Sequence, residues 1–155
     1  MNIVRLSRVA NMQSSKLEQC PPDFRGRNAE VAIGIGCKKG CSSEAIVSLV
    51  KRAMMAGCCT GAAGRLFSLE AKRGEAGLAQ AAKLLGLPIT FLDFEVLQQA
   101  SPQASTSSPK VMELYGLPSI AEAAALAGAG PSSVLLVARM SSGGASCAIA
   151  GRKEP

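Results

Sequence analysis

The segment Val31–Gly40, VAIGIGCKKG, holds residue types suited to binding an anion. Its apolar start is followed by two closely spaced glycines, then by Lys38, Lys39 and Gly40. Glycine lets a backbone approach a ligand, and the N–H groups at the start of a following helix attract anions, as lysine side chains do. We interpret the segment as an anion-facing loop after a strand. The alternative is that its glycines only serve a tight turn between a strand and a helix.

A second candidate group lies in LEAKRGEAGL, residues 69–78, where Lys72 and Glu75 follow a predicted strand. Loops after parallel strands open on one edge of a sheet, so we expect Lys72 to face the glycine loop. An ammonium group and a carboxylate at such an edge can bind an acidic ligand or transfer a proton. Alternatively, Glu75 only complements the dipole of the next helix, and Lys72 is a solvated surface charge.

Several other chemistries are disfavoured by the residues present. The dinucleotide fingerprint requires a third glycine where this chain has Lys39, and the phosphate-loop motif is absent. The chain has no histidine, which excludes Ser-His-Asp and Cys-His catalytic systems. The cysteines at 37 and 41 and at 58 and 59 lack the spacing of structural zinc sites, so we expect reduced, packed thiols. No metal and no cofactor are predicted.

The elements that position these groups alternate along the chain. Apolar periodicity predicts strands at 31–35, 66–69 and 89–92 and a hairpin formed by 134–139 and 147–152, with helices between them. Ser42 and Ser119 are predicted helix N-caps, and Gly57 and Gly86 are predicted helix ends. The order βαβαβααββ predicts an α/β fold with three layers, α/β/α, around a mixed, mostly parallel sheet of about five strands.

The charge distribution separates residues 1–28 from the remainder. That stretch has no sustained apolar period and carries half of the net charge of +6, so we expect an N-terminal extension, partly mobile, before a domain at 29–155.

The basic balance, with a pI near 9.2, favours a negatively charged partner. Aromatic residues make up only 3% of the chain, which disfavours nucleic acid. No apolar stretch is long enough for a membrane span, so we expect a cytoplasmic protein.

The order of several motifs resembles the CobE/CbiG C-terminal domain family of cobalamin biosynthesis. These motifs are GIGCKKG, EAKRGEAGL, a Ser-rich loop before a helix, GLPSIAEAAAL and a closing strand pair, and the resemblance runs from Val31 to Gly151. The corresponding site residues are those of the first loop, the second loop and the later helices, namely Gly34, Gly36, Cys37, Lys38, Gly40, Lys72, Glu75, Ser108, Gly116, Ser119 and Glu122.

The resemblance implies a role in building the corrin ring, with a corrinoid or precorrin intermediate as ligand. Such macrocycles carry acetate and propionate groups, which Lys38 and Lys72 would meet while the loop around Ser108 closes over the ring. Longer relatives open a lactone ring of a cobalt-precorrin, so lactone hydrolysis by Lys72 and Glu75 is one alternative, and docking on a pathway methyltransferase is another. Glu122 is a candidate ligand contact, although its spacing from Ser119 equally predicts a capping box. We expect a stand-alone form of the domain.

Overall fold

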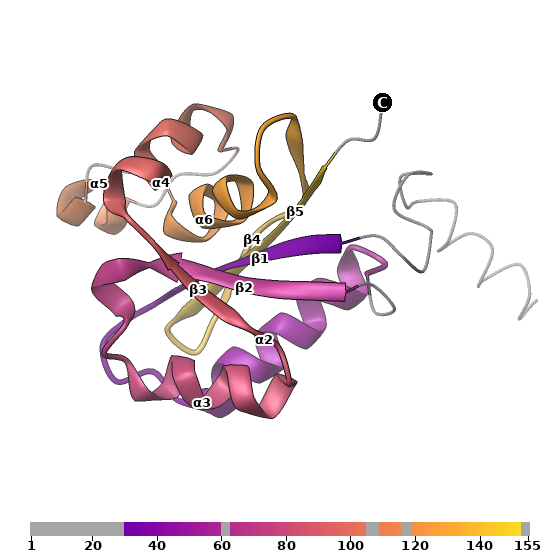
Figure 1. Cartoon of the computed structure of the whole chain (residues 1–155). Helices are drawn as coiled ribbons and strands as arrows, with labels where there is room; N and C mark the ends of the chain where they lie inside the picture. The colour runs from indigo at the N-terminus through magenta and orange to yellow at the C-terminus, as the bar shows by residue number, and fades with distance from the viewer. Residues whose placement is uncertain (1–29, 60–62, 105–108, 116–118, 153–155) are drawn as a thin grey trace, which may run out of the picture.

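The computed structural model describes residues 30–59, 63–104, 109–115 and 119–152, and within them the strands form one sheet in the order β3-β2-β1-β5-β4 (Figure 1). The elements along the chain are β1 (Glu30–Cys37), α2 (Ser43–Ala56), β2 (Ala63–Leu69), η2 (Glu70–Lys72), α3 (Ala76–Leu85), β3 (Ile89–Leu92), α4 (Phe94–Ala100), η3 (Ser101–Gln103), α5 (Pro109–Tyr115), α6 (Ile120–Ala129), β4 (Ser133–Ser142) and β5 (Ala145–Arg152). The strands β1, β2 and β3 are parallel, and β5 lies antiparallel between β1 and β4. The predicted mixed sheet of five strands is confirmed.

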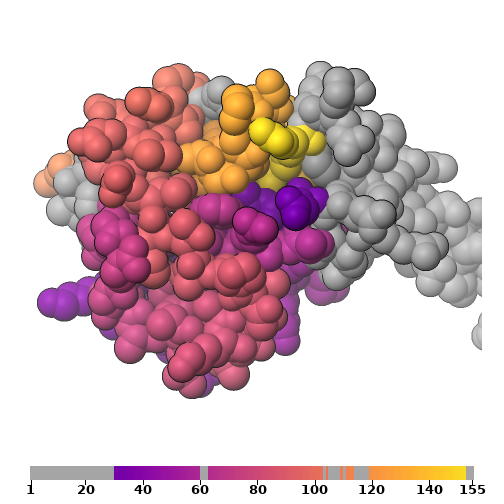
Figure 2. Space-filling model, viewed as in Figure 1, coloured from indigo at the N-terminus to yellow at the C-terminus, as the bar shows by residue number. Residues whose placement is uncertain are grey.

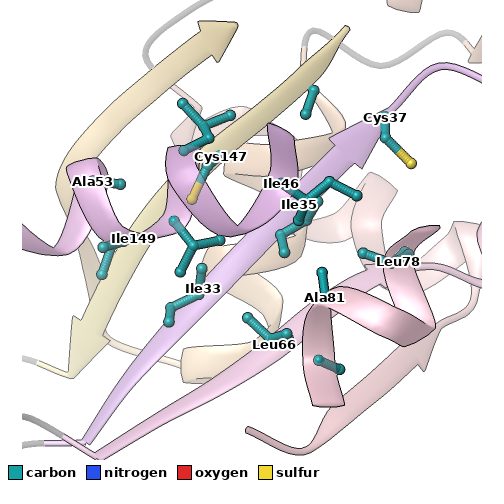
Figure 3. Packing of buried hydrophobic residues seen from close by; sticks show 14 of the residues in the cluster. Ile33, Ile35, Cys37, Ile46, Ala53, Leu66, Leu78, Ala81, Cys147 and Ile149 are labelled. Atoms are coloured by element: carbon teal, nitrogen blue, oxygen red, sulfur yellow. The ribbon is translucent and has the colours of Figure 1, made fainter. Parts of the chain in front are cut away.

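Helices cover both faces of the sheet, which confirms the three layers. On one face, α2 and α3 pack against side chains of β1, β2 and β5 (Figures 1 and 3). Ile33, Ile35 and Leu66 are fully buried there, and burying a side chain of that size contributes roughly 1.5–3 kcal/mol. On the other face, α6 packs against β1 and β5 and also contacts α4.

The strand β1 presents large side chains to one helical layer and small ones to the other. Ile33 and Ile35 face α2 and α3, whereas Ala32 and Gly34 face α6. A Cβ atom added to Gly34 would fall 1.9 Å from the carbonyl oxygen of Ala121, so α6 rests almost directly on the bare backbone of β1. Gly34 is therefore a packing residue in the middle of the sheet.

The ends of the helices follow the predicted capping signals. Ser42 Oγ accepts a hydrogen bond from the Ala45 N–H at 3.2 Å at the start of α2, and Ser119 Oγ does the same for the Glu122 N–H at the start of α6. Gly86 ends α3 in the left-handed conformation, with φ of +68°. These predicted caps are confirmed, and each N-cap contributes about 1 kcal/mol.

One predicted boundary is wrong in a way that affects the site. The strand β1 runs through Cys37, so Gly34 and Gly36 lie inside the strand and Cys37 is its last residue. The sequence predicts an end at Ile35 because glycine weakens strands and marks turns. Pairing with β5 overrides that local preference, since the register of these two strands continues to Cys37 opposite Ala145.

The cysteines and the remaining predictions have mixed outcomes. Cys37, Cys41, Cys59 and Cys147 are free and buried, as expected, whereas Cys58 is disulfide-bonded, so the prediction of reduced thiols is wrong for that residue.

Among the described residues, no helix is both long and apolar enough to cross a membrane, and no group of three metal-ligating side chains comes together. The predicted extension at 1–28 and the predicted site residues Ser108 and Gly116 lie outside the described residues.

Candidate ligand-binding edge

The ends of several strands come together at one edge of the sheet. The strands β1, β2 and β3 all finish there, and the antiparallel β5 begins there because Ala145 pairs with Cys37 (Figure 1). We call this region the carboxyl edge and define it as residues 38–42, 70–75 and 143–144. The sequence predicts a hairpin here, and the place of its turn at 143–144 beside the first loop follows from the position of β5 next to β1.

The first loop is fixed to the hairpin turn. The Lys38 N–H donates a hydrogen bond to the Gly144 carbonyl oxygen at 2.9 Å, and the Cys41 thiol lies 3.5 Å from the Gly143 carbonyl oxygen that accepts from it. Figure 2 shows a violet segment projecting from the left side of the surface, where Figure 1 places the connection between β1 and α2. The loop thus reaches solvent but is held at its base.

The first loop is also fixed to the second loop. The Gly40 N–H donates to Glu75 Oε2 at 3.1 Å, although these residues are 35 positions apart. A Cβ atom on Gly77, in the first turn of α3, would fall 2.1 Å from the Cys41 carbonyl oxygen, so α3 begins in close contact with the loop. Glu75 is thus a residue that joins two loops, a role in addition to the helix-dipole role that its sequence position suggested.

The amides of the first loop are hydrogen-bonded within the chain. The N–H groups of Lys38, Gly40 and Cys41 donate to Gly144, Glu75 and Lys38 respectively. These three amides are therefore not available to an anion in this structure. What remains for ligand recognition in this loop is the charge of the lysine side chains, and Gly40, with φ of +78°, serves the turn.

Lys38 and Lys72 follow two neighbouring parallel strands at the same edge, and each acts electrostatically on one of two buried thiols. Burial raises the pKa of Cys37 to about 11 while the nearby Lys72 ammonium opposes the shift, and burial raises the pKa of Cys41 while Lys38 opposes it. The Cys41 thiol also contributes to raising the pKa of Cys37, which lies at the end of β1 (Figure 3). Both thiols are protonated at neutral pH, so neither is poised as a nucleophile.

The electrostatic balance of the carboxyl edge is positive. Residues 38–42 and 70–75 carry four basic and two acidic side chains. Arg73 is paired with Glu70 through hydrogen bonds of 2.6 and 2.8 Å, and its guanidinium lies 4.8 Å from the centre of the Phe91 ring. The sequence interpretation missed this pair despite its i, i+3 spacing. Because the charges of Arg73 and Glu70 compensate each other, the lysines make the net charge of the carboxyl edge positive.

Glu122 occupies a different environment from the lysines. Its side chain is fully buried, and its carboxylate accepts a hydrogen bond from the Arg139 N–H at 2.9 Å. The register of β4 against β5 shifts between Val137 and Met140, and that irregularity turns the Arg139 N–H toward α6. The structure therefore gives this carboxylate a structural partner, and contact of Glu122 with a ligand stays a prediction.

The family of the chain follows from comparison with known proteins. The model of a family described as "Cobalamin synthesis G C-terminus" matches residues 31–150. The chain belongs to this family. The resemblance found in the sequence motifs is confirmed, and the protein is one of cobalamin biosynthesis.

Individual relatives agree with this assignment. Protein CobE of Sinorhizobium sp is 32% identical over 124 residues, which span 79% of this chain and 80% of that protein. The crystal structure of CobE, a protein from the cobalamin (vitamin B12) biosynthetic pathway, matches with a TM-score of 0.70 at 37% identity, covering 79% of this chain and 89% of that one. The cobalamin biosynthesis protein chiG from Agrobacterium tumefaciens matches with a TM-score of 0.61 at 34% identity over 80% of this chain and 99% of that one.

Proposed function

We propose that the protein binds a carboxylate-rich precorrin or corrinoid intermediate of cobalamin biosynthesis at the carboxyl edge. The observation that carries this proposal is that Lys38 and Lys72 lie in loops after the parallel neighbouring strands β1 and β2, and that the hydrogen bond from the Gly40 N–H to Glu75 Oε2 joins these two loops. Intermediates on the way to the corrin ring are apolar macrocycles fringed by carboxylates. Cations from two directions suit such a ligand better than one cation does.

The strength expected of this recognition follows from the exposure of the lysines. Lys38 is exposed and Lys72 is half-buried, so each pairing with a carboxylate contributes about 1 kcal/mol, in the range of exposed ion pairs. Affinity for the polyacid then comes from several such pairs together with burial of the ring, and it falls as salt screens the charges. The hydrogen bonds between the loops reduce the cost of ordering the edge when the ligand binds.

The proposal is tested by titrating purified protein with hydrogenobyrinic acid and following the absorption of the ring. Lys38→Met and Lys72→Met keep most of the side-chain volume and remove the charge, so each is expected to weaken binding about fivefold. Lys83→Met is the matched control, because Lys83 lies in the last turn of α3, toward the opposite edge of the sheet. Unchanged affinity in both edge variants, with unfolding midpoints like that of the wild type, would exclude the carboxyl edge as the binding site.

Hydrolysis of a precorrin lactone is the second candidate, because an ammonium group and a carboxylate lie in one turn. The Glu75 N–H donates to the Lys72 carbonyl oxygen at 3.0 Å within this turn, and the charges of both side chains act on the Cys37 thiol at the end of β1. In this reaction Glu75 would take a proton from water as the water oxygen attacks the lactone carbonyl. The ring C–O bond would then break as the protonated Glu75 returns its proton to the leaving oxygen, giving an alcohol and a carboxylic acid that ionises in water. Lys72 would stabilise the negative charge that develops before this bond breaks.

Glu75→Gln separates this second function from binding. The glutamine oxygen can still accept the hydrogen bond from the Gly40 N–H, so the loop is retained while the base is lost. If the wild-type protein opens a precorrin lactone and Glu75→Gln does so at the same rate, Glu75 is not the base. If the wild-type protein binds the lactone but forms no product, the function is binding alone.

A further inference from the structure

The turn between β4 and β5 holds the side chain of Lys38 as well as its backbone. A Cβ atom built on Gly144 would fall 2.4, 2.8 and 2.9 Å from Cε, Cδ and Cγ of Lys38. Three successive methylene groups of the lysine therefore run across the bare α-carbon of Gly144. The carbonyl oxygen of the same glycine accepts the hydrogen bond from the Lys38 N–H at 2.9 Å.

We propose that Gly144 is a positioning residue for ligand binding, which directs the Lys38 ammonium group over the carboxyl edge. This inference rests on the function proposed above. Fixing a free lysine side chain costs up to about 2 kcal/mol of conformational entropy. A side chain whose methylene groups already lie on the hairpin turn loses less entropy when its ammonium group meets a carboxylate.

A glycine is required at this position for two separable reasons. Its φ of +84° lies in the left-handed region, where other residues are strained, and its missing Cβ leaves the space through which the lysine passes. Gly86, at the end of α3, also has a positive φ, of +68°, so a substitution there is strained as well. Its added Cβ, however, would meet nothing within 4 Å. Gly86→Ala therefore reproduces the backbone strain without touching Lys38.

The Cβ introduced by Gly144→Ala collides with the flexible part of a side chain, so the chain is expected to fold while Lys38 is displaced. We expect Gly144→Ala to weaken binding of uroporphyrin, a porphyrin with acetate and propionate groups, about threefold to fivefold. The double variant Gly144→Ala/Lys38→Met should bind no more weakly than Lys38→Met alone, because both changes remove the same interaction. Gly86→Ala should bind like the wild type, and coproporphyrin, with the same ring and fewer carboxylates, should respond less.

A readout without ligand completes the test. In ¹³C relaxation measurements on lysine side chains, Cε of Lys38 should be more ordered than Cε of Lys39 in the wild type and should lose that order in Gly144→Ala. If Lys38 and Lys39 are equally mobile in the wild type, the positioning role is wrong whatever the binding data show. If Lys38→Met weakens binding but Gly144→Ala does not, or if the two losses add, the positioning role is wrong and the proposed function stands. If Lys38→Met binds like the wild type, both are overturned for this lysine.

Discussion

Gly34→Ala is expected to destabilise the fold more than any other glycine-to-alanine change within β1, β2 or the turn after β2. The added Cβ would lie 1.9 Å from the Ala121 carbonyl oxygen and 2.5 Å from the Ala125 nitrogen, both main-chain atoms of α6. Ordinary contacts between such atoms are about 3.5 Å, so α6 must move outward by on the order of 1 Å. A gap of that size forfeits a quarter to a half of the contact energy beneath the helix, and overpacking costs about 1–3 kcal/mol.

We therefore expect Gly34→Ala to lower the free energy of unfolding by about 3 kcal/mol and the unfolding midpoint by roughly 10 °C. Urea titration followed by circular dichroism measures the first quantity. Two other glycines give a graded control. A Cβ on Gly64 would meet the flexible Cδ1 of Ile33 at 3.0 Å, and a Cβ on Gly74 would meet nothing within 4 Å. Gly64→Ala should therefore cost about 1 kcal/mol and Gly74→Ala nothing or a slight gain.

The opposite result would change the interpretation of the motif. Were Gly34→Ala as stable as the wild type, the close contact of α6 with β1 could not be the reason for this glycine. Were it stable and also unable to bind a corrinoid, the sequence-based prediction of a ligand contact at Gly34 would be the better explanation.

Three further predictions concern buried polar groups. Glu122→Ala should cost about 3 kcal/mol in urea titration and Glu122→Gln about 1 kcal/mol, because only the glutamine can still accept from the Arg139 N–H. Ser68→Ala should cost about 1 kcal/mol, since it removes the fully buried hydrogen bond of 2.7 Å from Ser68 Oγ to the Ile35 carbonyl oxygen; no change in the unfolding midpoint would contradict this. Burial raises the pKa of Cys37 from 9.0 to about 11. The contribution of the protonated Cys37 thiol to stability should therefore be fully present below pH 9 and be lost as the pH rises through 11. The loss is at most about 2.7 kcal/mol. Between these pH values, the free energy of unfolding of Cys37→Ala should therefore depend less on pH than that of the wild type.

Local sequence signals were sufficient for most of the fold. Apolar periodicity located the strands and helices, and the serine caps at Ser42 and Ser119 lie where their spacing from the following helix placed them. These features depend on residues within a few positions of each other, so a single sequence contains them. The strand boundary at Gly36 failed because pairing with β5, more than 100 positions away, decides it.

The candidate site could be predicted in its parts but not in its connections. Lys38, Lys72 and Glu75 were identified, and the rule that loops after parallel strands share one edge brought them together. Three connections of the site depend on tertiary packing. They are the hydrogen bond from the Gly40 N–H to Glu75, the contact of Lys38 with Gly144, and the hydrogen bond that Glu122 accepts from a main-chain N–H of β4. No spacing in the sequence indicates them, although the two glycines of the hairpin turn were a signal that the turn is unusual.

The motif GIGCKKG combines residues that have separate physical tasks. Gly34 allows α6 to approach the sheet, and Gly40 allows the turn into α2, so both would be required of this fold with or without a ligand. Lys38 is exposed, and no cap, core contact or turn of the described structure requires its charge. Because the fold explains the glycines and leaves the charge unexplained, removing that charge at Lys38 is the change in this motif that tests binding with the least effect on stability.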